Sequence, residues 1–173
     1  MSKKTNLIKP VIAQIIPALN NGGVERGTIE TSQAISDIGW NPIVISSGGM
    51  LESQLKRAGA KHITLPVNKK NPVSWQFTKN KLRKILIDEN VDIVHVRSRV
   101  PAWVGLPVAK VLAIPTVSTI HGKFEAYNLW KRAYNKQLLK ADEIIAISKF
   151  TKSVIERQFP KLLPNISLNV IHR

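Results

Sequence analysis

The chain has 173 residues, of which 43% are hydrophobic and none is cysteine, and its 26 Lys and Arg against 11 Asp and Glu give a formal net charge of +15. The length and apolar content suit one folded domain over residues 1–173 rather than a disordered chain, and the lack of cysteine excludes disulfides, cysteine zinc sites and a cysteine nucleophile. The basic N-terminus does not resemble a signal peptide, and no stretch approaches the roughly 20 apolar residues of a membrane-spanning helix, so we expect a cytoplasmic protein.

The positive charge predicts attraction to an anionic partner. Basic residues are densest in two segments with helical patterns, 79–84 and 131–140, where a solvated helix face is the alternative interpretation. No basic-aromatic RNA-binding pattern and no helix-turn-helix pattern is present, so we do not expect nucleic acid to be the partner. An anionic lipid surface is favoured, since each basic residue near one contributes roughly 1 kcal/mol. The sequence therefore predicts peripheral contact with the inner face of the cell membrane.

Short runs rich in Val and Ile alternate with helical patterns along the whole chain. The predicted strands span residues 11–16, 42–46, 62–65, 92–96, 116–120, 143–147 and 167–171. The predicted helices cover residues 24–38, 51–58, 75–86, 102–112, 127–138 and 150–155, with Pro107 in the fourth. The strands are mostly continuous apolar runs, which is typical of strands buried on both faces of a parallel sheet. The alternation predicts an α/β fold with a doubly wound, largely parallel sheet and right-handed crossovers.

The first predicted strand leads into a glycine turn and then a helix. Gly22 and Gly23 form this turn, and Glu25 lies in the first helical residues. Both glycines can adopt a positive φ and lack a Cβ, so a ligand can approach the backbone closely. A helix N-terminus in this position suits a phosphate or another oxyanion. The turn lacks the G-x-G-x-x-G and Walker A patterns, so a simple tight turn is an equally good interpretation.

Ligands of doubly wound sheets bind beyond the carboxyl ends of the strands, where several polar residues of this chain are expected. Arg97, Ser98 and Arg99 follow the fourth strand, and His121 follows the fifth. The two arginines can hold a phosphate or carboxylate through bidentate hydrogen bonds, or they can be ordinary surface residues. His121 is favoured as functional because it ends a strand and precedes a glycine, whereas His95, inside a strand, is favoured as a core residue.

Other polar residues near the strands have structural interpretations. Ser148 is expected to cap the helix that follows it, and Asp92 and Asp142 are expected to fix the beginnings of two strands. Glu25 and Glu125 are the acids expected to be exposed near the mouth of the sheet, and Lys123 follows His121 there. No carboxylate pair and no metal-ligand spacing is evident, so we expect neither a metal nor another cofactor.

Four segments carry a resemblance to a known family: IIPALNNGGVERGTIE, VDIVHVRSRVPAW, STIHGKFEAYN and ADEIIAISKFTKSVIE. In this order and spacing they resemble the N-terminal half of retaining GT-B glycosyltransferases of the group-1/family-4 type. They are most similar to bacterial members linked to lipopolysaccharide and other envelope polysaccharides. The resemblance covers essentially the whole chain, and it implies a Rossmann-like domain that chiefly binds the acceptor.

The resemblance also implies roles for individual residues. The turn at Gly22 and Gly23, with Glu25, is expected to lie against the diphosphate of a nucleotide-sugar donor. His121 matches the family histidine that faces the donor sugar near the reaction centre. The loop of Arg97, Ser98 and Arg99 matches the acceptor side.

Family members continue into a second Rossmann-like domain that holds most of the nucleotide-sugar site, including a Glu-x7-Glu motif. No segment of this chain matches that domain, so we expect the chain to be inactive alone and to need the other half, for instance from a separate chain. Two alternatives stay open at this point: a non-catalytic α/β module that binds an anionic sugar or a lipid headgroup, and the disfavoured nucleic-acid-binding protein.

Overall fold

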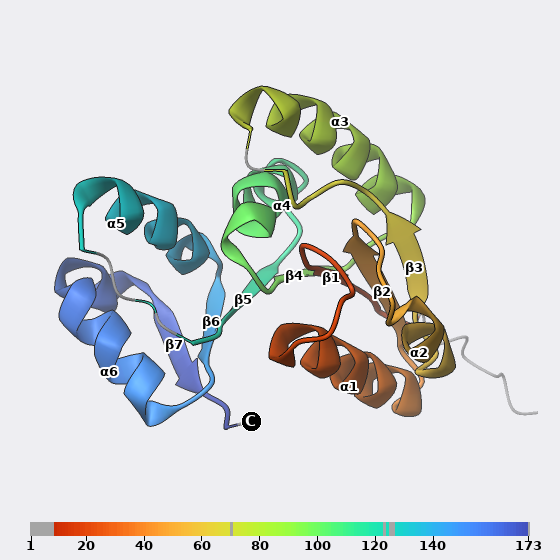
Figure 1. Cartoon of the computed structure of the whole chain (residues 1–173), viewed down its shortest axis with the longest axis horizontal. Coiled ribbons are helices and arrows are strands. Elements are labelled where there is room, and N and C mark those ends of the chain that lie inside the picture. Colours follow the sequence, from red (N-terminus) through yellow and green to blue (C-terminus); the bar gives the residue numbers. More distant parts are fainter. Residues whose placement is uncertain (1–8, 70, 123, 125–126, 173) are drawn as a thin grey trace, which may run out of the picture.

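The fold is built on one seven-stranded sheet in which every pairing is parallel, in the order β3-β2-β1-β4-β5-β6-β7 (Figure 1). The computed structural model describes residues 9–69, 71–122, 124 and 127–172. The strands are β1 (Val11–Ile15), β2 (Asn41–Ser46), β3 (Lys61–Thr64), β4 (Ile93–Val96), β5 (Thr116–Ile120), β6 (Glu143–Ala146) and β7 (Ser167–Val170). The parallel sheet and all seven strands predicted from the sequence are thus confirmed, with bounds that differ by one residue at some ends.

Two carboxylates hold strand beginnings as the sequence predicts. Asp92, just before β4, accepts a hydrogen bond from the backbone N–H of Val11 at 2.7 Å and so fixes the β1–β4 register. Asp142, just before β6, accepts hydrogen bonds from the backbone N–H and the hydroxyl of Thr116 at 2.8 and 2.7 Å. The Thr116 hydroxyl bond lowers the pKa of Asp142 from its ordinary value.

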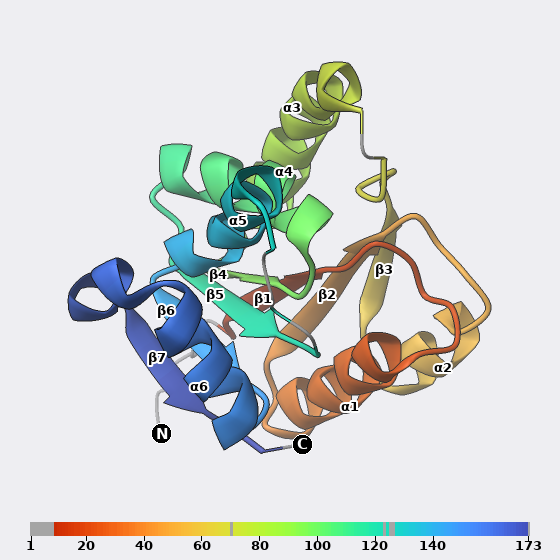
Figure 2. The same cartoon turned by 60° about the vertical axis from the view of Figure 1, so that its left-hand side comes forward.

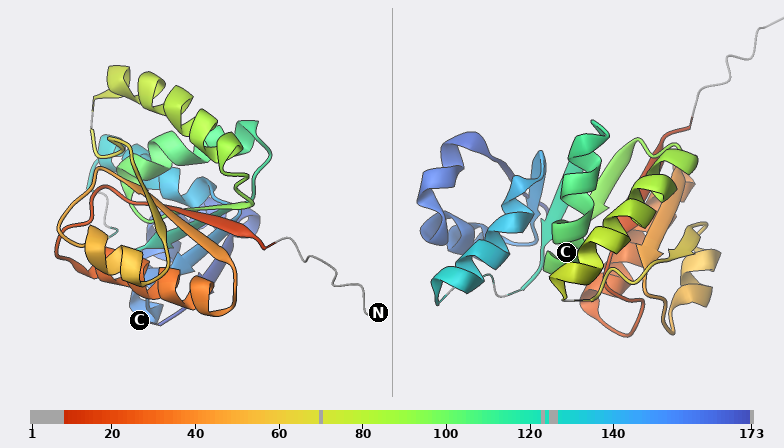
Figure 3. Two further views of the ribbon diagram at one scale, coloured as in Figure 1. Left: turned by 90° about the vertical axis from the view of Figure 1, so that its right-hand side faces the viewer. Right: turned by 90° about the horizontal axis from the view of Figure 1, so that it is seen from above.

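The helices lie on both faces of the sheet, as the right-handed crossover rule requires. They are α1 (Gly23–Asp37), α2 (Glu52–Arg57), α3 (Pro72–Asp88), α4 (Arg99–Val111), α5 (Leu129–Lys136) and α6 (Lys149–Gln158), with 3-10 turns η1 (Gln137–Lys140) and η2 (Pro160–Asn165). Helices α1 and α2 cover β1–β3 on one face, and α3–α6 cover the other (Figures 1 and 3). No helix in the described ranges is both long and apolar enough to cross a bilayer.

Alternation of side chains along the strands divides the core in two. Ala13 and Ile15 point toward the α3–α6 face and belong to the larger core cluster, together with Val94 and Val96 of β4. The smaller cluster lies under α1 and α2 and includes Ile16 and Val44. The face under α1 also carries buried polar side chains of the strands, among them Gln14 of β1 and His95 of β4.

In the described part of the chain, the α1 side of β5–β7 is uncovered. There Glu143 accepts hydrogen bonds from the side chains of Ser167 and Asn169, at 2.5 and 2.9 Å, and Val117 and Ile145 are only half-buried. Within the residues that the structure describes, no helix lies over these strands, although parallel sheets are normally covered on both faces. We call this region the open half-face.

Helices α4 and α5 depart from the sequence prediction. Helix α4 begins at Arg99 rather than at residue 102, so Arg99 is helical and not a loop residue. The helical pattern over 127–138 is buried only in its second half: α5 starts at Leu129, and the side chains of Tyr127 and Trp130 are 77% and 87% exposed, whereas Leu138 in η1 is buried. Exposed aromatic residues at helical spacing give the same sequence pattern as buried ones, so the pattern did not separate the two cases.

Candidate functional site

The carboxyl ends of β1, β4 and β5 form one edge of the molecule, because these strands are neighbours in the sheet (Figures 1 and 2). The glycine turn follows β1, the Arg97–Arg99 segment follows β4, and His121 follows β5. The structure therefore brings the three predicted groups to the same edge, as expected for a doubly wound sheet.

The backbone at Gly22 is extended and leads directly into α1, so this segment is not a left-handed turn. Gly22 is the N-cap of α1 with φ −167° and ψ 171°, and Gly23 is the first helical residue, so neither glycine uses the positive φ that the sequence allowed. A Cβ added to Gly23 would meet nothing within 4 Å. The carboxylate of Glu25 instead lies against Gly22, beside the N-terminus of α1. A side chain at Gly23 would thus extend into open space, whereas an acid lies beside Gly22.

A second glycine loop braces the first. Gly48 and Gly49, after β2, have φ of 86° and 151°. A Cβ on Gly49 would come within 2.5 Å of the Leu19 carbonyl group, and Leu19 exchanges backbone hydrogen bonds with Gly48 and Leu51 at 2.9 Å. Gly49 allows close approach of backbone to backbone, so this loop supports the β1–α1 loop.

Arg97 is buried and bonded to α1. Its two terminal nitrogens donate to the hydroxyls of Thr28 and Thr31 at 3.3 and 2.9 Å. Beneath them, Gln14 of β1 donates to the Thr28 carbonyl at 3.1 Å and to the Ser32 hydroxyl at 2.9 Å. The underside of α1 is therefore polar at the point where it covers β1 and β4.

Arg99 extends in another direction, toward α5. Its Nε donates to the Asn135 side-chain oxygen at 2.5 Å, and its guanidinium lies 5.8 Å from the centre of the Phe124 ring. Burial lowers the pKa of Arg99 and raises that of its neighbour Tyr134. Ser98, between the two arginines, is the extended N-cap of α4. Among the described residues, the two arginines thus hold different helices, Arg97 α1 and Arg99 α5.

Two histidines, His95 in β4 and His121 directly after β5, lie near the carboxyl ends of these strands. His95 is buried in β4, as expected of a core histidine, with its Nε2 2.7 Å from the Thr119 hydroxyl. Burial lowers the pKa of His95 well below its ordinary value, and the charges of Arg97 and His121 add to this effect. His121 is half-buried and precedes Gly122, whose φ is 65°. His95, Arg97 and His121 therefore form one electrostatic cluster. Lys123 and Glu125 lie outside the described residues.

Sequence patterns missed the side chains that hold the arginines. Thr28 and Thr31 occupy inward positions of α1, where the helical pattern indicated packing, and Asn135 lies on the buried side of α5. Polar side chains at inward helix positions are a usable signal, because a buried polar group needs a partner. The pattern does not identify that partner.

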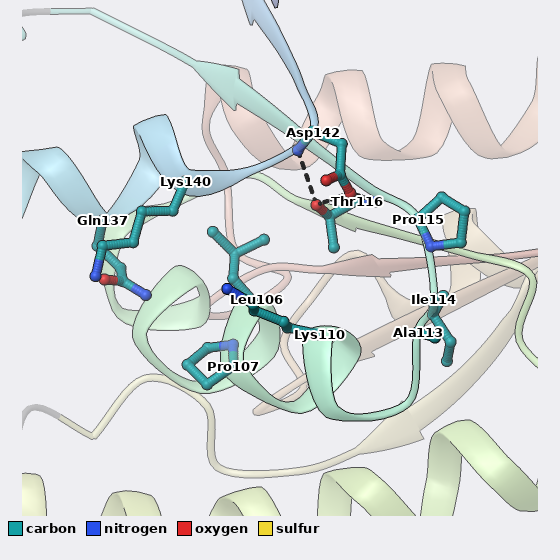
Figure 4. A pocket seen from close by; sticks show the side chains of 10 residues that line it. All are labelled: Leu106, Pro107, Lys110, Ala113, Ile114, Pro115, Thr116, Gln137, Lys140 and Asp142. Carbon is teal, nitrogen blue, oxygen red and sulfur yellow. Dashed lines mark hydrogen bonds between the residues drawn. The ribbon is translucent and has the colours of Figure 1, made fainter. Parts of the chain in front are cut away.

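A cavity of about 820 Å³ lies elsewhere, at the amino ends of β5 and β6 (Figure 4). Its wall includes Lys110 of α4, Lys140 of η1 and the hydrogen-bonded pair Thr116 and Asp142. It is at the opposite end of the strands from the glycine turn and His121, so it is separate from the candidate site.

Comparisons with known proteins agree with this geometry. The model of Glycosyltransferase Family 4 matches residues 21–173. A glycosyltransferase from Rickettsia africae is 36% identical with a TM-score of 0.80, and the match covers 95% of this chain and 43% of that one. A search of curated protein sequences gave no match.

Two more distant structures share the fold. Anabaena Alr3699/HepE in complex with UDP and glucose has a TM-score of 0.73 at 14% identity, covering 94% of this chain and 44% of that one. Sucrose-phosphate synthase from Thermosynechococcus elongatus has a TM-score of 0.69 at 14% identity, covering 95% and 48%. The chain spans less than half the length of these three proteins. Its architecture is that of the N-terminal half of a GT-B fold, and the chain belongs to Glycosyltransferase Family 4.

Proposed function

We propose that this chain is the acceptor-binding half of a glycosyltransferase that moves a sugar from a nucleotide-sugar donor to an envelope glycan or a lipopolysaccharide-type acceptor. The observation that carries the proposal is the meeting of the glycine turn, the arginine segment and His121 at one sheet edge of a family 4 domain. The structures of HepE with UDP and with UDP-glucose support a nucleotide-sugar donor.

Each group has a role in this proposal. The N-terminus of α1 at Gly23 approaches the donor diphosphate, and Glu25 adjoins the same helix end. His121 lies beside the donor sugar, where an imidazole can donate a hydrogen bond or transfer a proton. Arg97, Ser98 and Arg99 lie on the acceptor side. Arg97 keeps α1 in position through Thr28 and Thr31, and the half-buried Arg99 orders α5 beside the acceptor.

One wall of a cleft cannot hold donor and acceptor together, and positioning supplies most of the rate of such a transfer. We therefore expect residues 1–173 alone to transfer no sugar, and a second Rossmann-like half, in the same or a separate chain, to restore transfer. Robust turnover of UDP-sugars by the chain alone would show that this half is sufficient.

The site assignment is tested in the assembled enzyme. His121→Ala is expected to reduce sugar transfer by at least about 100-fold, in the range of a lost acid–base group, with a small change in melting temperature. Gly23→Ala adds a methyl group in open space, so it should weaken UDP-sugar binding without loss of folding. Unchanged donor affinity in a folded Gly23→Ala variant, or intact transfer in His121→Ala, would contradict the assigned roles.

A further inference from the structure

Helix α3 has an apolar outer stripe as well as an apolar inner one. Its inner side chains, Leu82 and Leu86, are buried in the core. On its outer side Val73, Phe77 and Ile87 are 83%, 71% and 52% exposed. At 3.6 residues per turn these three positions fall on one side of the helix. A stack of Trp75 on Trp103 of α4, with ring centres 5.4 Å apart, holds α3 in this orientation.

Helix α5 presents a similar surface. Leu129 and Trp130, in its first turn, are 84% and 87% exposed, and Tyr127 just before it is 77% exposed. The amino group of Lys131 lies 4.7 Å from the centre of the Tyr127 ring. Helices α5, α4 and α3 lie side by side over the same face of the sheet (Figure 3, right). We call the outer surface of α3 and α5 the α3–α5 face.

The charge of this face is mainly positive. Its apolar side chains are flanked by exposed basic residues, namely Lys81, Arg83 and Lys84 of α3 and Lys131, Arg132 and Lys136 of α5. The sequence contains no Asp or Glu from residue 53 to 87, and Glu125 is its single acid from residue 93 to 141. Asp88, the last residue of α3, is the first carboxylate along that helix. The outer surfaces of α3 and α5 therefore combine exposed apolar side chains with six basic ones, with Asp88 at the C-terminal end of α3.

We propose that the α3–α5 face docks on an anionic lipid bilayer. A helix surface with exposed apolar residues between Lys and Arg inserts at the boundary of headgroups and acyl chains, and Trp and Tyr favour that depth. Basic residues add attraction to anionic headgroups. Nucleic acid satisfies the charge but offers no apolar phase for Val73, Phe77 and Leu129. The inference concerns a surface outside the sugar-transfer site and holds whether or not the chain takes part in transfer.

Docking in this way fixes the orientation of the candidate site. Helices of a parallel α/β sheet run opposite to the strands, so the N-termini of α3 and α5 lie at the carboxyl ends of the strands. The exposed residues Val73, Phe77, Leu129 and Trp130 are near these N-termini. The edge that carries His121 is therefore at the rim of the docked face, close to the lipid headgroups.

A charge-reversal pair tests the face. Lys81→Glu with Lys84→Glu changes the α3–α5 face, and Lys56→Glu with Arg57→Glu makes the same change in net charge on exposed residues of α2, over the other face of the sheet. Sedimentation with vesicles of neutral lipid and of 30% phosphatidylglycerol is measured at low and high salt, with circular dichroism as the check of folding. At about 1 kcal/mol per basic residue, the α3 pair should lower binding to anionic vesicles by roughly 30-fold or more, and the α2 pair by less than threefold.

Insertion is tested separately, because the chain contains no cysteine and a single introduced one can be labelled alone. An environment-sensitive dye at Phe77→Cys should shift to the blue with anionic vesicles, and the same dye at the exposed control Met50→Cys should not. Equal losses from both charge pairs, no vesicle binding, equal dye shifts, or binding to RNA that exceeds binding to vesicles would each overturn the proposal.

Discussion

His95 shows how one residue links the candidate site to the stability of the fold. It is buried beneath the strand ends, 2.7 Å from the Thr119 hydroxyl, and burial together with Arg97 and His121 lowers its pKa well below 6.5. The folded protein thus holds His95 neutral, whereas the unfolded chain protonates it at its ordinary pKa. Between these two pKa values the unfolded state binds more protons, so stability falls as the pH falls.

We therefore expect the free energy of unfolding to be unaffected by His95 above about pH 7 and to decline below about pH 6.5, with His95 contributing about 1.4 kcal/mol per pH unit. Urea unfolding at several pH values between 7 and 5 measures the slope. His95→Gln keeps a polar side chain but does not titrate, so its slope should be smaller by that amount. An unaltered slope in His95→Gln would contradict the neutral, buried state.

The hydrogen bond from Arg97 to Thr31 can be tested in the same way. Thr31→Val removes the acceptor of its 2.9 Å hydrogen bond, and bonds to charged groups contribute about 1.5–3 kcal/mol. Thr78→Val is the matched control, because Thr78, like Thr31, donates to a carbonyl four residues earlier in its helix and, among the described residues, bonds to no arginine. We expect urea unfolding to show a larger loss for Thr31→Val. Equal losses would mean that Arg97 contributes nothing through this bond.

The arginine segment also shows where sequence reasoning stops. The pattern Arg-Ser-Arg left open whether the two arginines hold one anion or are ordinary surface residues, and its predicted place after β4 was correct. The direction of each side chain depends on α1 and α5, which are distant in sequence and supply Thr31 and Asn135. The residues that gather at the edge could thus be predicted from strand order, whereas their partners required the tertiary structure.

Among the helices and strands, the sequence predicted best those segments that are buried on both faces of the sheet. The strands were predicted from continuous Val and Ile runs, and their parallel pairing confirms them. Helix α5 was misjudged because exposed aromatic residues give the same periodicity as buried ones. Ser148 was predicted as an N-cap and is one, with its hydroxyl accepting from the Thr151 N–H at 3.1 Å.

Removal of this cap should lower the stability of the protein measurably. Ser148→Ala should lower the free energy of unfolding by about 1 kcal/mol, because it leaves a helix N–H without its acceptor. Ser153→Ala, at an exposed position within α6, serves as the control and should change stability by less than about 0.5 kcal/mol. If the two variants unfold at the same urea concentration, the cap does not stabilise α6.

Helices cover the seven strands of the sheet unevenly. Strands β1 and β2 lie between helices on both sides, whereas β6 and β7 have helices on one side and the open half-face on the other. Local opening is easiest where few apolar contacts must break. We expect amide hydrogen exchange by mass spectrometry to be at least about tenfold faster in β6 and β7 than in β1 and β2. Uniform protection across the sheet would show that the half-face is covered in solution.

The central place of β1 has a consequence for the order in which the chain folds. Val11 at the start of β1 and Asp92 before β4 are 81 residues apart, yet β4 is a direct neighbour of β1. At about 5–20 residues per second, a ribosome needs roughly 4–16 s to make the intervening segment. During that time β1 can pair with β2, but Ala13 and Ile15 have no α4 to cover them. A nascent chain halted before β4 therefore exposes the apolar side chains of β1, which can aggregate. Binding of a chaperone is most useful during this interval.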